Sequence, residues 1–340
     1  MICRADGALI GAVSGGCVEA DVYERSREVI AQGRATRVLY DARVLGDDLF
    51  GLGLGCDGEL EILIEPFSWW RSEVGRALFA ETIRLLEAAE PVVLAVCVPA
   101  QGEREAPCAR LLVDRSGIRA GGLGSAPLDD AARAAAEQLL AERSASRMLE
   151  SGSGEGNIFL DLIEPSPRLI VVGSGHDAIP LVRMARELDV SVTVFDNREL
   201  LTSQERFPWA REVACAPIEA LVESVSFDGS PAVVIMTHSY AKDGLALRLL
   251  FGADPSLSDL GLLGPRPRSE RLLDELAREG VRPSASIREV LRYPVGLDLG
   301  SESPAEIALS VLAEILAQRN RRAASPLSQV VGPIHAGEAA

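Results

Sequence analysis

The chain has 340 residues. At roughly 100–200 residues per domain, this length predicts two or three domains. Hydrophobic residues make up 47% of the chain and charged residues 25%, a globular composition. The 50 acidic and 34 basic residues give a net charge of −16, which disfavours nucleic acid as a partner. The sequence shows neither a signal peptide nor a long apolar run, so we expect a cytoplasmic protein that does not enter a membrane.

Cysteine, histidine and lysine limit the chemistry further. The six cysteines are widely spaced, which is not a disulfide framework. The three histidines are scattered and no C-x-x-C spacing occurs, so we expect no metal site. The only lysine is Lys242, and its context fits neither a Schiff-base lysine nor a phosphate-binding loop.

The first half of the chain shows signs of an internal duplication. Each copy predicts a glycine turn, a helix and two strands, and the motif L-I-E-P at Leu63–Pro66 recurs at Leu162–Pro165. Other pairs at a constant offset are Gly7 with Gly117, Gly11 with Gly121, Ala31 with Ala141, and Arg37 with Arg147. We expect an α+β domain in which copy one (residues 1–66) packs with copy two (residues 67–166).

The two copies differ at their beginnings. Copy two starts with an apolar strand, Val92–Val98, to which copy one has no counterpart. We therefore expect that the natural protein begins earlier than Met1. The sheet of copy one would then have an open edge here.

Two glycine–cysteine segments occur in copy one only, at Ser14–Glu19 and Gly51–Cys56. Glycine-rich turns expose backbone N–H groups, which lower a thiol pKa and bind anions. Cys17 and Cys56 are therefore candidate functional thiols, although small buried cysteines in tight turns remain the alternative. Cys97 lies within an apolar strand and is expected to be structural.

The second half predicts a Rossmann-like, doubly wound parallel sheet over residues 167–322, followed by a flexible tail at 323–340. Apolar strands alternate with helices throughout this region. The predicted strands are Arg168–Val172, Ser191–Phe195, Glu212–Ala216, Ala232–Thr237 and Gly261–Leu263. The predicted helices are Ala178–Leu188, Glu219–Ser224, Asp243–Leu250 and a last one through Leu316, which a Ser303–Glu306 capping box opens.

A glycine-rich turn joins the first strand and helix of this sheet. It predicts a phosphate site made by Gly173, Ser174, Gly175, His176 and Asp177, at the positive end of the helix dipole. Asp196 ends the next strand, where an acid binds a ribose hydroxyl, whereas Arg198 would suit a 2′-phosphate. The preference between NAD and NADP stays open. The alternative is a Rossmann-like domain that binds another phosphate, or nothing.

Further candidates follow the later strands. His238 is the best acid/base candidate, followed by Asp243, and no acid that would orient His238 is identified. The alternative for His238 is a capping or loop histidine. Arg266 and Arg268 would clamp a phosphate, or would be solvated charges. The turn with Gly296 and Gly300 is expected to border the same crevice.

Together these segments resemble the xanthine dehydrogenase accessory (XdhC/CoxI) family. The matching segments lie near both ends of the chain and follow the family's order, while residues 67–164 match poorly. The segments are Gly11–Glu19, Gly51–Glu59, Val171–Ala178, Glu205–Pro208, Val233–Ser239, Gly261–Arg266 and Pro294–Ser310.

The resemblance implies a chaperone for the molybdenum cofactor, either as molybdopterin or as its dinucleotide. Such a protein holds the cofactor during sulfuration and assists its insertion into a molybdenum hydroxylase, of the xanthine or carbon monoxide dehydrogenase type. Cys17 and Cys56 would face the cofactor across an inter-domain cleft. A cysteine desulfurase and a second copy of the chain are further expected partners. An NAD(P)-dependent oxidoreductase is the alternative, and a client-binding adaptor is a third interpretation.

Overall fold

The computed structural model describes residues 1–16, 18–41, 59–98, 108–142, 145–149 and 157–330. The chain divides into two units, Met1–Glu164 and Pro165–Ala340. Cys17 and Cys56 lie outside the described residues. Among the helices of these ranges, none has the length and hydropathy needed to cross a membrane.

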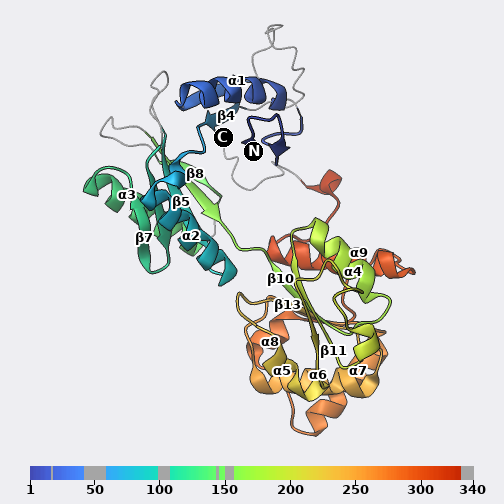
Figure 1. The fold of residues 1–340 in the computed structure, drawn as a ribbon. Coiled ribbons are helices and arrows are strands. Elements are labelled where there is room, and N and C mark those ends of the chain that lie inside the picture. Colours follow the sequence, from blue (N-terminus) through green and yellow to red (C-terminus); the bar gives the residue numbers. More distant parts are fainter. Residues whose placement is uncertain (17, 42–58, 99–107, 143–144, 150–156, 331–340) are drawn as a thin grey trace. The chain divides into compact units, whose positions relative to one another are not determined.

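The second unit contains a six-stranded, wholly parallel sheet in the order β12-β11-β10-β13-β14-β15 (Figure 1). This order reverses direction between β10 and β13, as in a Rossmann fold. The predicted fold class is therefore confirmed for this unit. The strands are β10 (Arg168–Val172), β11 (Ser191–Asp196), β12 (Glu212–Cys215), β13 (Ala232–Ile235), β14 (Asp259–Leu262) and β15 (Leu291–Arg292).

Helices cover both faces of this sheet because alternate strand residues point to opposite sides. Leu169 and Val171 pack with α4 and α9, whereas Ile170 and Val172 pack with the helices of the other face. Figure 1 shows the sheet between these two layers. The helices are α4 (Ala178–Glu187), α5 (Leu221–Ser224), α6 (Tyr240–Ala253), α7 (Arg266–Arg278), α8 (Ala285–Val290) and α9 (Pro304–Arg319).

The strands and helices predicted for this unit are found, with differences in some of their bounds. The capping box that opens α9 is present, with Ser303 and Glu306 satisfying each other's backbone N–H groups. The strand predicted at Gly261–Leu263 begins earlier, at Asp259. Three elements were not predicted: α7, whose first turn, Arg266-Pro267-Arg268, resembles a loop, and the short elements α8 and β15. Proline is nevertheless compatible with the first turn of a helix.

The first unit contains a five-stranded antiparallel sheet in the order β7-β6-β5-β9-β8. Val93 on the central strand packs against α3, while its neighbour Val92 packs against α2 on the other face. The predicted α+β class is thus found. The elements are α2 (Glu73–Glu87), β5 (Val92–Val98), β6 (Arg110–Asp114), β7 (Gly117–Gly122), α3 (Ala126–Glu142), β8 (Arg147–Leu149) and β9 (Asn157–Ile163).

The order β6-β7-α3-β8-β9 repeats the order of the preceding elements, β1-β2-α1-β3-β4. Among the described residues, β1 pairs only with β2 and β4 only with β3, so two separate two-stranded sheets form. In copy two, β5 joins the corresponding strands into one sheet. That copy one lacks its first strand stays a prediction. Its elements are β1 (Ile2–Cys3), β2 (Leu9–Ile10), α1 (Glu19–Gln32), β3 (Thr36–Asp41) and β4 (Glu59–Ile64).

The two copies pack against each other within the first unit. Ala35 of copy one is fully buried against Val96 and Cys108 of copy two. Arg110 on β6 forms an ion pair with Glu65, the residue that follows β4. The finer domain boundaries stay predictions.

Asp259 is a buried carboxyl group at the start of β14. Its pKa is raised from 3.8 to about 6, chiefly by burial; Arg292 opposes the rise and Glu314 contributes to it. Because the folded-state pKa is the higher one, the folded protein holds this proton more tightly than the unfolded chain does. The free energy of unfolding should therefore fall as pH rises from about 4 to about 6.

We predict that Asp259→Asn removes this pH dependence. Relative to the parent chain, the variant should gain up to about 3 kcal/mol in the free energy of unfolding between pH 4 and pH 7, since one pKa unit corresponds to about 1.4 kcal/mol. Urea denaturation at a series of pH values measures the difference. Parallel curves for parent and variant would contradict the prediction.

Candidate functional site

The glycine turn after β10 packs so tightly against the neighbouring strands that only glycine fits its first position. Gly173 has φ 128°, and its N–H donates to the Phe195 carbonyl on β11. A Cβ at Gly173 would lie 2.4 Å from the Met236 carbonyl oxygen after β13. The turn is therefore held against both neighbouring strands, at the carboxyl edge where such sheets bind ligands.

Asp196, at the end of β11, holds this turn in place through hydrogen bonds. Its carboxylate accepts hydrogen bonds from the Ser174 N–H (2.7 Å) and hydroxyl (2.9 Å), and it forms an ion pair with Arg198. Burial opposes ionisation, but the hydrogen bonds from Arg198 and Ser174 outweigh it and lower the pKa of Asp196 to about 2. The Asp196 side chain is only 3% exposed. A ribose contact by Asp196 stays a prediction, and Arg198 and Ser174 already occupy the carboxylate.

The start of α4 offers unpaired donors. Within the described part of the chain, the backbone N–H groups of Gly175, His176 and Asp177 have no hydrogen-bond acceptor. The positive end of the helix dipole lies at the same place. His176 is exposed, whereas Ser174 is fully buried. Three of the five predicted turn residues thus present donors suited to an anion.

A histidine–carboxylate pair lies beside this turn. His238 Nε2 is 2.7 Å from Asp177 Oδ2, although the sequence analysis identified no acid that orients His238. His238 has φ 59°, in the left-handed region that non-glycine residues seldom adopt. Both residues follow neighbouring strands of the sheet, β10 and β13. That shared edge is the signal that could have predicted the pair.

Asp243, the second acid/base candidate, takes part in a different set of hydrogen bonds and ion pairs. It is 1% exposed, accepts from the Thr237 hydroxyl, and pairs with Arg268 at 2.6 Å. Its carboxylate therefore joins the ends of β13, α6 and α7. Arg268, predicted to clamp phosphate, is engaged here instead.

The remaining predicted residues have other neighbours. Arg266 is exposed, 3.9 Å from Glu270 and 5.9 Å from the Tyr293 ring centroid. Gly296 donates its N–H to Glu314, and a Cβ there would meet the Ser310 hydroxyl at 2.4 Å. Gly300 has open space around it. Within the described residues, no hydrogen bond or ion pair joins these three residues to the glycine turn.

The described residues contain no group of three or more His, Cys, Asp or Glu side chains arranged to hold a metal ion. Among the described cysteines, Cys3 and Cys215 are free thiols. Cys97 lies partly buried on β5, where the sequence analysis expected a structural role.

We predict that Asp196→Ala lowers the free energy of unfolding by about 3 kcal/mol, because it leaves a buried N–H and Arg198 without their acceptor. Urea denaturation of the purified protein measures this change. Glu199→Ala, at an exposed neighbouring residue, is the control and should change stability by less than about 0.5 kcal/mol. Unchanged stability together with weaker nucleotide binding would instead identify Asp196 as a ligand contact.

Comparison with known proteins gives consistent matches. The XdhC Rossmann domain matches residues 169–315, and the XdhC and CoxI family matches residues 1–41 and 85–151. The chain is 31% identical to a protein of Bacillus subtilis (strain 168) described as a probable xanthine dehydrogenase subunit, over 94% of this chain and 88% of that protein.

Two further matches agree with this result. A crystal structure described as a xanthine dehydrogenase from Bacillus halodurans is 26% identical, with a TM-score of 0.72, and the match covers 96% of this chain and 88% of that one. The uncharacterized protein YqeB of Escherichia coli (strain K12) is 28% identical, over 76% of this chain and 48% of its own length. The chain therefore belongs to the XdhC and CoxI family.

Proposed function

We propose that this protein assists the maturation of a molybdenum hydroxylase of the xanthine dehydrogenase type, by binding the molybdenum cofactor before its insertion. The names of the relatives support the connection with xanthine dehydrogenase. A carbon monoxide dehydrogenase is the other expected type of client. The protein would act as a carrier rather than as a metabolic enzyme.

The observation that carries this proposal is the glycine turn at the start of α4. The cofactor is an anionic phosphate ester, and the unpaired N–H groups of Gly175, His176 and Asp177 suit such a group. A side chain at Gly175 would disturb the Asp177–His238 pair, since a Cβ there would lie 2.7 Å from Asp177 Oδ1 and 3.3 Å from His238 Cδ2. These residues would hold the phosphate end.

Bound cofactor supplies a soft metal and a site for a sulfido ligand, for which thiolates are the suited protein groups. Cys17 and Cys56 are the thiols we propose for this role. A cysteine desulfurase as sulfur donor and a homodimeric state are further parts of the proposal.

An NAD(P)-dependent oxidoreductase is the second candidate function. The Asp177–His238 pair favours it, because a histidine oriented by a carboxylate is a common acid/base arrangement. Hydride transfer to or from a nicotinamide cofactor by the purified protein would support this function over that of a carrier.

We predict that Gly175→Val abolishes cofactor retention while the protein still folds. The atoms nearest to an added Cβ are side-chain ends of Asp177 and His238, which can shift, so the melting temperature should change little. The pterin content of protein purified from a molybdenum-replete host should fall at least about tenfold, that is by about 1.4 kcal/mol or more in binding free energy.

Gly252→Val is the matched control. A Cβ at Gly252 meets nothing within 4 Å, so pterin content should stay at the parent level. Equal pterin in the parent chain and in Gly175→Val would exclude this turn as the phosphate site. A parent chain that carries no pterin would contradict the proposed function itself.

We predict that Cys17→Ser preserves folding and impairs either cofactor retention or sulfur transfer to it. Serine keeps the size of the side chain but removes the thiolate. Pterin content and the activity of the reconstituted client enzyme are the readouts, with Cys3→Ser as the control. A variant whose main defect is lower thermal stability would show that Cys17 has a structural role.

A further inference from the structure

Helix α9 (Pro304–Arg319) carries an apolar stripe on its outer side. Its inner side is buried in the core of the second unit, where it packs with α4 (Figure 1). On the outer side, Leu309 is 54% exposed and Leu316 is 41% exposed. Ala305, one turn before Leu309, is exposed as well. Because residues four and seven positions apart share a helix face, these three form one continuous stripe.

The polar side chains of α9 do not solvate this stripe. Glu306 takes part in the capping box at the start of the helix. The Ser310 hydroxyl donates to a backbone carbonyl of the preceding turn at 2.6 Å, and the Glu314 carboxylate accepts from a backbone N–H of the same turn at 2.7 Å. These are the only polar residues from Pro304 to Ala317, so each already serves the fold of its own chain. A helix that is apolar on its outer side as well is normally covered there by another surface.

The sequence of α9 has a symmetry that fits a second copy of the same helix as that surface. Ala305 and Leu316 lie at equal distances from the midpoint of residues 310 and 311, and so do Glu302 and Arg319. Consider two copies paired antiparallel about a two-fold axis at this midpoint, so that the same surface of each copy is used. Each Ala305 would then face Leu316 of the second copy. A small side chain opposite a large one allows the helices to approach closely.

The charges at the two ends of the stripe complement each other in the same arrangement. Glu302 precedes the capping residue of α9, and Arg319 is the last residue of the helix. Within one chain they are about 25 Å apart along the helix axis, so they cannot pair with each other. In the antiparallel pair, each Glu302 would lie beside Arg319 of the second copy. Charge complementarity therefore favours a second copy over an unrelated apolar surface.

Leu309 would lie at the centre of this contact. In the antiparallel pair, the two Leu309 side chains would be about 4.5 Å apart along the axis, a distance at which they pack together. Each is more than half exposed in the single chain, so pairing would remove apolar area from water. The helix is about 24 Å long, which gives a contact at the small end of the range for stable dimers. The dimer should therefore dissociate reversibly on dilution.

We propose that the outer stripe of α9, defined by Ala305, Leu309 and Leu316, is the contact between two copies of this chain, with the two helices antiparallel. The inference rests on the homodimeric state included in the proposed function, and it assigns a surface to that state. It does not depend on which ligand the protein carries.

Sedimentation velocity of the full-length protein, at low and at high micromolar concentration, tests this contact. The parent chain should be dimeric at the higher concentration. Leu309→Lys places a charge at the centre of the contact and should weaken the dimer at least about tenfold. Its melting temperature should stay close to that of the parent chain, because Leu309 is exposed. Leu200→Lys is the matched control, since Leu200 is 95% exposed outside α9, and it should associate like the parent chain.

A charge reversal tests the antiparallel arrangement separately. Glu302→Arg and Arg319→Glu each place like charges at both ends of the contact, and each should weaken the dimer at least about threefold at low salt. The double variant exchanges the two charges and should restore the dissociation constant of the parent chain to within about twofold. Because these residues cannot reach each other within one chain, such a rescue requires a contact between copies.

A parent chain that stays monomeric at high micromolar concentration would overturn the inference. If Leu309→Lys then also lowered the melting temperature, another part of the same chain would cover the stripe. A dimer that Leu309→Lys leaves unchanged, or a double charge variant that fails to rescue the single ones, would equally show that this contact is wrong.

Pterin content separates these outcomes from the proposed cofactor function. A monomeric parent chain that carries pterin would contradict the contact on α9 and leave cofactor binding standing. A dimer that responds to the variants as expected but carries no pterin would contradict cofactor binding and leave the contact standing.

Discussion

The contact on which the candidate site most depends is the one between the Asp196 carboxylate and the Ser174 backbone. It joins the end of β11 to the turn after β10, at a point where neither residue is accessible to water. A buried carboxylate is stable only when its charge is neutralised, and Arg198 supplies the opposite charge. The shape of the glycine turn, and with it the direction of the free N–H groups of α4, follows from this arrangement.

The carboxyl edge of the parallel sheet shows how an acidic protein can present a site for an anion. Three acids near the ends of adjacent strands each have a cationic or histidine partner: Asp196 with Arg198, Asp177 with His238, and Asp243 with Arg268. The helix N-terminus and Lys242 remain as donors. Local pairing therefore allows an edge suited to phosphate within a chain whose net charge is −16.

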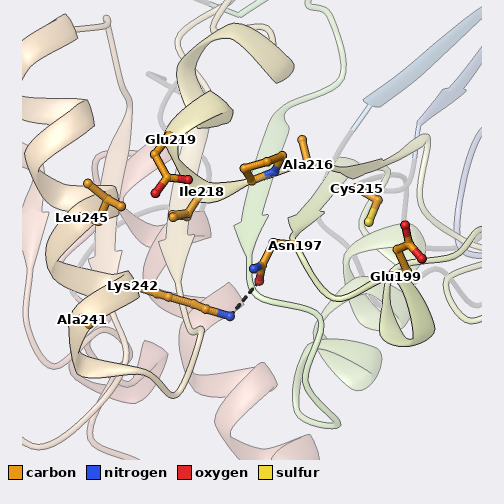
Figure 2. Close-up of a pocket in the computed structure, with 10 residues that line it drawn as sticks. Asn197, Glu199, Cys215, Ala216, Ile218, Glu219, Ala241, Lys242 and Leu245 are labelled. Carbon is orange, nitrogen blue, oxygen red and sulfur yellow. Dashed lines mark hydrogen bonds between the residues drawn. The ribbon is translucent and has the colours of Figure 1, made fainter.

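The sequence was sufficient for the fold of the second unit because its strands are apolar throughout and its turns carry glycine or capping residues at the expected places. The sequence did not predict which site residues pair with one another. Asp177 and His238 lie far apart in the sequence, and only the strand order brings them together. Arg268 and Asp243 were each assigned a role in ligand chemistry, whereas they neutralise each other. A cavity of about 540 Å³ beside Lys242 (Figure 2) was missed for the same reason, since the residues that line it come from the segments after β11, from the end of β12 and the residues that follow it, and from α6.

The two copies in the first unit differ in a way that bears on local unfolding of the protein. Among the described residues, the core of copy two contains twelve buried residues around one five-stranded sheet, whereas that of copy one contains six around two two-stranded sheets. Backbone amides that lack a cross-strand acceptor exchange with solvent readily, and a small core lowers the cost of local opening. Copy one should therefore be the least cooperative part of the first unit, fraying while the β5-centred sheet stays closed.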